Sequence, residues 1–259
     1  MKFSDLLRLP ETKTILSLND VSTTLLHAKI IKNKVFLKRI YTDFYQYFNN
    51  LVSSNTGERC LVELGSGGGF IKEIISDVIT SDIIALPNID RQFSALKMPF
   101  EKNTVDAFLM INVLHHVDDS MSFFKEVDRC LKIGGKIIMV EPANTLFGRF
   151  IYKNFHHELF DPSGDWGFES GGPLSSANGA IPWIIFYRDR QKFEKEFPNL
   201  KIKQLVSHTP FRYLISGGIS MRQLLPSFMY NFVKIFESIL TPLNNYLGMF
   251  VSIEIEKVA

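Results

Sequence analysis

The stretch from Glu63 to Gly69 places an acid directly before a loop that consists almost entirely of glycine, Glu-Leu-Gly-Ser-Gly-Gly-Gly. Glycines at such a turn allow the backbone to approach a ligand closely. Asp82 stands seventeen residues after Gly65, at the end of the next apolar run. A carboxylate at that place can accept hydrogen bonds from both hydroxyls of a ribose. The loop and the acid together predict a site for a nucleotide-like cofactor.

Two common phosphate-binding loops do not match this stretch. A triphosphate-binding loop ends in Gly-Lys-Ser/Thr, whereas this loop continues into Phe70-Ile71-Lys72. A dinucleotide-binding loop needs a small residue where Phe70 stands, because helix and strand pack closely there. The remaining pattern is an acid followed by glycines at 65, 67 and 69.

The elements that must hold this loop alternate along the chain. Short apolar runs at 60–64, 78–83, 105–114 and 135–142 predict strands, and the segments at 68–77 and 119–131 predict helices between them. Such alternation is typical of an α/β fold with a parallel sheet, whose ligands lie at the carboxyl ends of the strands. A helical pattern covers 20–52, a further helix is expected from about Asp189, and strands are expected at 200–208 and 249–258.

The segments "VELGSGGGF", "TSDI", "ALKMPFEKNTVDAFLMINVLHHV" and "FFKEVDRCLKIGGKIIMVEP" resemble successive motifs of class I S-adenosylmethionine-dependent methyltransferases. The resemblance covers about residues 58–142. It implies a Rossmann-like sheet of seven strands with helices on both faces and an antiparallel last strand, for which 249–258 is suited. We expect a helical segment at 1–55, followed by the methyltransferase domain at 56–259 with insertions at 143–190 and 220–247.

The resemblance also implies S-adenosylmethionine as the cofactor and assigns roles in binding it. Gly65 and Gly67 would approach its methionine portion, Glu63 would orient the loop or the cofactor's amino group, and Asp82 would hold the ribose. Many members have an aspartate beside the adenine, where this chain has Ser94. The complete expected cofactor set is Glu63, Gly65, Gly67, Asp82, Ala95, Leu96 and Asn112.

Methyl transfer to a hydroxyl or an amine requires alignment and a base, since the cofactor supplies the driving force. Histidine and carboxylate side chains follow the strand at 105–114 and recur in the insertion. Of these, we expect His116, His157 and Glu158 to act in catalysis; the others are His115, His156 and Asp161. Adjacent histidines point apart on a strand or a helix and share one ion poorly, so no metal is expected.

The segments 152–162, 172–190 and 213–220 are similar to a smaller group of bacterial methyltransferases found among surface-polysaccharide genes. The acceptor expected from this resemblance is a small molecule or a glycan, such as a nucleotide-linked or lipid-linked sugar. Asp161 and Trp166 are the expected substrate contacts, because they lie in polar, loop-like sequence. The apolar stripe at 225–240 is expected to pack on the sheet, with peripheral contact to a membrane as the alternative.

Composition limits the partners. The formal net charge is +2, from 29 basic and 27 acidic residues, which gives no reason to expect nucleic acid. No signal peptide or spanning segment is expected, and two cysteines without a metal or disulfide pattern indicate a cytoplasmic protein. Two other functions stay open: an NAD-dependent sugar-modifying oxidoreductase, and a binding module without catalysis. The sequence does not indicate an oligomeric state.

Overall fold

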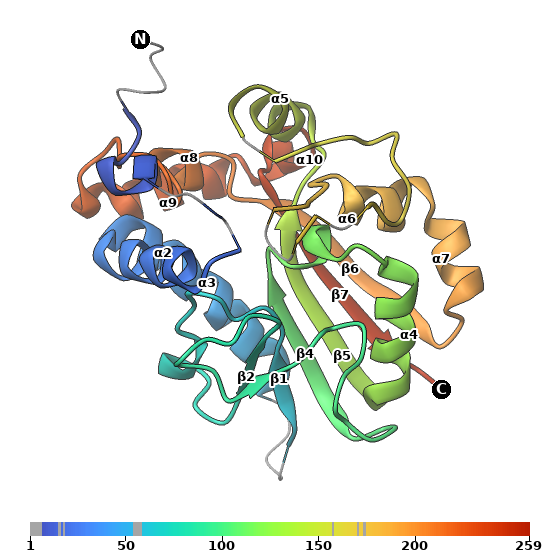
Figure 1. Cartoon of the computed structure of the whole chain (residues 1–259). Coiled ribbons are helices and arrows are strands. Elements are labelled where there is room, and N and C mark those ends of the chain that lie inside the picture. Colours follow the sequence, from blue (N-terminus) through green and yellow to red (C-terminus); the bar gives the residue numbers. More distant parts are fainter. Residues whose placement is uncertain are drawn as a thin grey trace.

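A seven-stranded sheet crosses the molecule in the order β3-β2-β1-β4-β5-β7-β6 (Figure 1). Its strands are β1 Leu61–Glu63, β2 Ile79–Asp82, β3 Arg91–Gln92, β4 Val105–Ile111, β5 Leu131–Pro142, β6 Leu200–His208 and β7 Phe250–Lys257. Neighbours are parallel except at β7, which runs antiparallel to both β5 and β6. The Rossmann-like fold with an antiparallel last strand is confirmed. This computed structural model describes residues 7–14, 17, 19–53, 59–156, 158–169, 171–172 and 175–259.

Helices cover both faces of the sheet (Figure 1). Short 3-10 turns form at Pro10–Thr14, Ile71–Glu73, Leu114–His116, Ser227–Met229 and Thr241–Leu243, and a π-turn forms at Ile184–Arg188. The helices are α2 Val21–Asn33, α3 Val35–Val52, α4 Ser120–Cys130, α5 Leu146–Phe155, α6 Ile181–Trp183, α7 Arg190–Glu196, α8 Arg212–Ser216, α9 Tyr230–Ile239 and α10 Asn244–Leu247. In the described part of the chain, no helix combines the length and the apolar character needed to cross a membrane.

The segment before the sheet consists of two helices that share the core of the sheet. The helical pattern expected at 20–52 is interrupted at Lys34, whose extended backbone separates α2 from α3. The Lys34 ammonium donates to the carbonyl oxygens of Gly218 and Met221 at 2.6 and 2.7 Å. On α3, Phe36, Ile40, Phe44 and Phe48 repeat every four residues and are all buried. Their stripe lies against the sheet, as the ring contact between Phe44 and Phe250 shows.

The helix expected at 68–77 is not formed, and the chain makes only the 3-10 turn at Ile71–Glu73. Gly67, Gly68 and Gly69 lower the helix propensity at its start. Phe70 then turns into the core, where its ring meets Tyr45 edge to face at 5.1 Å. The packing of Phe70 therefore directs this segment more strongly than its apolar periodicity does.

The expectation that the apolar stripe at 225–240 packs on the sheet is wrong for most of its members. Phe228, Phe232, Phe236 and Ile239 are 79%, 73%, 52% and 70% exposed, and only Leu225 is partly buried against the core. The reason is that α9 turns its other face inward, through Tyr230, Val233 and Glu237.

The buried face of α9 is organised by a cluster of charges. Arg212 donates to Asp43 of α3 at 2.6 Å and pairs with Glu237 of α9. Glu237 in turn accepts the backbone N–H groups of Phe211 and Arg212 at 2.8 and 2.7 Å. Charged groups inside a protein need such partners, so this cluster determines which face of α9 is covered.

Candidate active site

The glycine loop and Asp82 are in direct contact at the carboxyl end of the sheet. The Gly67 backbone N–H donates to Asp82 Oδ2 at 2.9 Å, and the Ile84 N–H donates to Oδ1 at 3.0 Å. Below the loop, Ser66 and Ser81 join β1 to β2, with Ser66 N–H donating to the Ser81 carbonyl at 2.8 Å. The structure thus brings together the loop and the acid that the sequence analysis paired.

The glycines of the loop are needed for different reasons. Gly65 and Gly67 have positive φ values of 63° and 47°, which side chains rarely adopt. A Cβ at Gly65 would lie 2.6 Å from Val113, and one at Gly68 would lie 2.7 Å from the backbone of Ala28. A Cβ at Gly67, in contrast, would have no atom of the described residues closer than 3.8 Å, so the side-chain position of this glycine is open. That space suits a ligand that approaches the loop backbone.

Glu63 supplies a buried carboxyl group under the loop. It is 3% exposed, and its Oε2 has no hydrogen-bond partner among the described residues. Burial raises the pKa of Glu63 to about 8; hydrogen bonds from Ser66 and Tyr45 oppose the shift, and the nearby Asp82 charge adds to it. An unpartnered acceptor at this depth fits a cationic ligand group, such as the amino group of S-adenosylmethionine.

The other expected cofactor residues lie at the ends of neighbouring strands. Asn112 follows β4 with a φ of 56°, and its side chain hydrogen-bonds with the Tyr41 hydroxyl of α3. The Phe93 N–H donates to the Asp82 carbonyl at 3.1 Å, which holds the following Ala95 and Leu96 beside the end of β2. Both are partly buried against the core. Their roles in binding adenine stay predictions.

His115 is held by a carboxylate that sequence reasoning did not identify. Glu141, at the end of β5, is fully buried and accepts from His115 Nδ1 at 2.6 Å. Its other oxygen accepts the N–H groups of Val113 and Leu114 at 2.8 and 2.7 Å. The pair could have been expected from the strand order, because β4 and β5 are parallel neighbours in the sheet. Residues that follow β4, such as His115, therefore lie near the end of β5, where Glu141 stands. His115 therefore presents only Nε2 to the space above.

His116 and Glu158, two of the expected catalytic residues, lie together with His115. Glu158 oxygens are 3.5 Å from His115 Nε2 and 3.7 Å from His116 Nε2. Burial lowers the pKa of His115, but the charges and hydrogen bonds of Glu141 and Glu158 outweigh this and raise it to about 10. Burial and the His115 charge lower the pKa of His116 to about 4. His157, the third expected catalytic residue, is outside the described residues.

Glu158 stays ionised at neutral pH. Although burial opposes the charge, hydrogen bonding and the charge of His115 hold the pKa of Glu158 well below its usual range. The pKa of the Tyr213 hydroxyl is raised, first by burial and then by the nearby Tyr41 and Glu158. Hydroxyl groups from α3 and α8 therefore lie near the imidazole and carboxylate groups of this cluster.

The two expected substrate contacts are placed differently. Trp166 is in the core at 5% exposure, where its indole N–H donates to Asp189 at 2.9 Å, and its contact with substrate stays a prediction. Its polar sequence neighbours concealed this burial. Asp161 lies at the surface of the insertion and accepts from the Ser163 backbone and hydroxyl at 2.9 and 2.6 Å. Its contact with substrate stays a prediction.

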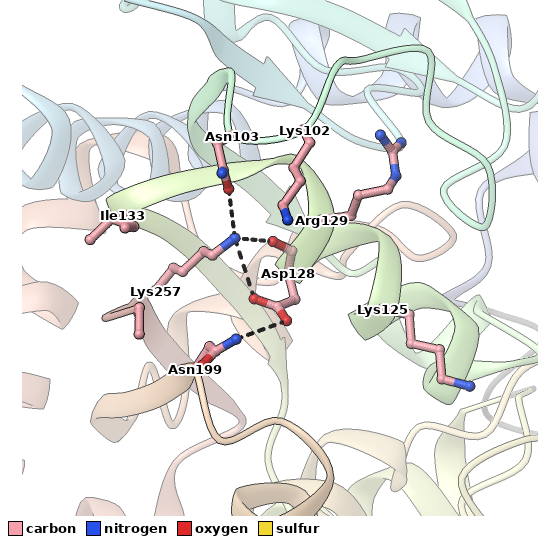
Figure 2. A pocket seen from close by; sticks show the side chains of 9 residues that line it. Lys102, Asn103, Lys125, Asp128, Arg129, Ile133, Asn199 and Lys257 are labelled. Atoms are coloured by element: carbon pink, nitrogen blue, oxygen red, sulfur yellow. Dashed lines mark hydrogen bonds and ion pairs between the residues drawn. The ribbon is translucent and has the colours of Figure 1, made fainter.

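A hollow of about 370 Å³ lies at the opposite, amino-terminal edge of β4 and β5 (Figure 2). Its central cation is already paired, because Lys257 Nζ contacts Asn103 Oδ1 at 2.8 Å and the Asp128 carboxylate at 3.5 Å. Asn199 donates to the same carboxylate at 3.4 Å. This hollow is structural and belongs to the other end of the sheet from the glycine loop.

Comparison with known families identifies the central part of the chain. Residues 62–139 match the family model described as a methyltransferase domain. The matched segment is less than a third of the chain. The match begins within β1, includes the glycine loop and Asp82, and ends within β5. The matched segment contains Glu63, Gly65, Gly67 and Asp82, which are the residues expected to approach S-adenosylmethionine.

One curated relative of this chain is sterol 4-C-methyltransferase of Caenorhabditis elegans, 28% identical over 128 residues. The match covers 48% of this chain and 37% of that protein, so the chain spans well under half of the relative. Geranyl diphosphate C-methyltransferase of Streptomyces coelicolor, solved with S-adenosyl-L-homocysteine, has a TM-score of 0.49 at 14% identity. That alignment covers 95% of this chain and 88% of the other. A possible histamine N-methyltransferase of Thermotoga maritima gives a TM-score of 0.49 at 17% identity, over 88% and 99% of the two chains.

Proposed function

We propose that this chain transfers the methyl group of S-adenosylmethionine to an oxygen or nitrogen atom of a small-molecule acceptor. The observation that carries the proposal is the contact between Gly67 and Asp82 at the same edge of the sheet as the cluster of His115, His116 and Glu158. The acceptor's lone pair attacks the methyl carbon, the carbon–sulfur bond breaks, and its electron pair stays on sulfur. S-adenosylhomocysteine leaves as the neutral thioether.

The acceptor's proton passes to the histidine and glutamate cluster. At neutral pH, His115 is a cation because its pKa is raised to about 10, and His116 is neutral because its pKa is lowered to about 4. Glu158 is a carboxylate and His116 a neutral imidazole, so these two groups are able to take up the proton. The expected part of His157 in this step stays a prediction.

We extend the proposal to an acceptor of the sugar or glycan class, nucleotide-linked or lipid-linked. The hydroxyl and carboxylate groups around Glu158 support a polar acceptor. Exposed apolar side chains support a lipid-linked one and peripheral contact with a membrane; they are Phe150 and Phe155 on α5 and Phe228, Phe232, Ile235 and Ile239 on and before α9. Two free cysteines, Cys60 and Cys130, support a cytoplasmic location.

Thermal stability measured with S-adenosylmethionine, S-adenosylhomocysteine and NAD tests the proposal. A ligand that binds only the native state adds about 2.7 kcal/mol to the free energy of unfolding at a hundredfold excess over Kd. We expect both adenosyl ligands to stabilise the chain and NAD to have no effect. Asp82→Ala should remove the stabilisation, whereas Asp165→Ala, at an exposed site, should keep it. Stabilisation by NAD alone, or a full response in Asp82→Ala, would contradict the assignment.

A further inference from the structure

We propose that His115, His116 and Glu158 bind one divalent transition-metal ion of the zinc class. One ligand atom from each residue lies within 4.8 Å of the other two. The three come from two distant segments, since the histidines end the 3-10 turn after β4 and the glutamate belongs to the insertion. In this turn the two adjacent histidine rings lie 4.4 Å apart, so they do not point away from each other as on a strand.

The first ligand, His115, is oriented by a fixed carboxylate. Its Nδ1 donates to Glu141 Oε2 at 2.6 Å, and two backbone N–H groups hold the other Glu141 oxygen. When a metal replaces the Nε2 proton of the His115 cation, the remaining proton stays on Nδ1 beside Glu141, and the Nε2 lone pair is on the side of Glu158. A carboxylate behind the remote nitrogen is the usual support of a metal-binding histidine.

The second ligand, His116, has its tautomer determined by a carbonyl group. Its Nδ1 lies 3.2 Å from the Ser176 carbonyl oxygen, which can only accept, so Nδ1 carries the proton. Nε2 then presents a lone pair to Glu158 Oε1 at 3.7 Å. Two acceptors face each other across this distance, an arrangement that a cation between them stabilises.

The spacing favours a metal ion over a single proton. A proton on His115 Nε2 satisfies only the pair with Glu158 at 3.5 Å and leaves the lone pair of His116 opposite the same carboxylate. Ligands about 2.1 Å from a tetrahedral metal are about 3.4 Å from one another, close to the 3.5 Å between His115 Nε2 and Glu158 Oε2. The other carboxylate oxygen, Oε1, lies 3.7 Å from His116 Nε2. One divalent ion can therefore take a lone pair from each of the three side chains.

The donor set also selects the kind of metal. Two imidazoles with one carboxylate suit zinc, whereas magnesium and calcium prefer oxygen ligands. Three protein ligands leave a position for a water molecule or an acceptor oxygen. A metal there lowers the pKa of a bound hydroxyl, so that its proton can pass to water while the three side chains hold the ion. This role rests on the proposed function, but the binding of the metal does not.

Zinc binding to the full chain, purified with a chelator and then dialysed, tests the proposal without cofactor or acceptor. We expect one equivalent of Zn²⁺ by calorimetry and elemental analysis, and much weaker binding of Mg²⁺. His116→Ala and Glu158→Gln should each weaken zinc binding more than about 100-fold, and Glu141→Gln should weaken it about 10- to 100-fold. Glu169→Gln, the same change at an exposed glutamate of the insertion, should leave it unchanged.

Glu158→Asp, which retains a carboxylate, should keep one equivalent of zinc at lower affinity, and circular dichroism checks that each variant is folded. Absence of zinc binding by the wild type, or one equivalent retained by both His116→Ala and Glu158→Gln, would overturn the site. A chain stabilised by S-adenosylmethionine that binds no zinc would overturn this inference alone. A chain that binds zinc and does not respond to S-adenosylmethionine would contradict the proposed function alone.

Discussion

Replacement of Glu63 by glutamine separates the stability of the free protein from its affinity for the cofactor. The wild-type carboxyl group is buried under the glycine loop, and its pKa is raised to about 8. Glutamine has nearly the same shape but cannot ionise. We expect Glu63→Gln to be more stable than the wild type at pH 8 without ligand, and to bind S-adenosylmethionine more weakly.

The magnitude follows from the pKa, which rises from 4.5 in the unfolded chain to about 8 in the folded protein. Each pKa unit corresponds to about 1.4 kcal/mol, so ionising Glu63 costs about 5 kcal/mol more in the folded free protein than in the unfolded chain. Because the folded pKa is the higher one, the contribution of Glu63 to stability is complete below pH 4.5 and is lost as the pH rises to 8. A cationic amino group beside Oε2 recovers part of this cost when the cofactor binds.

Titration calorimetry between pH 6 and pH 8.5 measures the effect. Below pH 8 the cofactor must displace the proton of Glu63, so its affinity should increase about tenfold per pH unit and level off above pH 8. Wild-type affinity at pH 8 should thus exceed that at pH 6 by about 100-fold, whereas Glu63→Gln should show little dependence. Equal wild-type affinities at the two pH values would refute the placement of the amino group at Glu63.

Three further predictions concern other parts of the molecule. Gly65→Ala forces a side chain into a positive-φ position and against Val113, so denaturant titration should show a loss of about 1–3 kcal/mol. Arg212→Met leaves two carboxylates without their shared partner and should cost about 3–5 kcal/mol, seen as a lower Tm. Burial, and then the Arg212 charge, lowers the pKa of His208 from 6.5 to about 4. The free energy of unfolding should therefore fall by up to about 3 kcal/mol between pH 6.5 and pH 4. If His208→Gln shows the same dependence of unfolding free energy on pH, His208 is not its cause.

Most of the sheet could be predicted from the sequence, because strand periodicity is a local property. The strand expected at 200–208 has the observed bounds Leu200–His208, and the one expected at 249–258 forms at Phe250–Lys257. The helix expected at 68–77 did not form because Phe70 packs on Tyr45. This contact joins residues that are distant in the sequence, so the local apolar periodicity cannot predict it. Likewise, the apolar stripe on α9 has the spacing of a buried stripe. The opposite face is buried because Glu237 pairs with Arg212, which is distant in the sequence.

In the candidate site, too, local patterns could be predicted and contacts between distant residues could not. Glu63, Gly65, Gly67 and Asp82 could be predicted together because their spacing follows one β-loop-β unit. The contact of His115 with Glu141 joins the ends of two strands, and Glu158 reaches it from the insertion. No spacing in the sequence encodes these distances, which depend on the order of strands in the sheet.

The packing of α2 on the glycine loop has a kinetic consequence. A Cβ at Gly68 would lie 2.7 Å from the Ala28 backbone, so the helix rests on the loop with no room for a side chain between them. The loop cannot change shape without displacing α2, and α2 cannot separate without exposing the loop. A ligand that fixes the loop should therefore also hold α2 in place, and amide hydrogens of α2 should exchange more slowly once the ligand is bound.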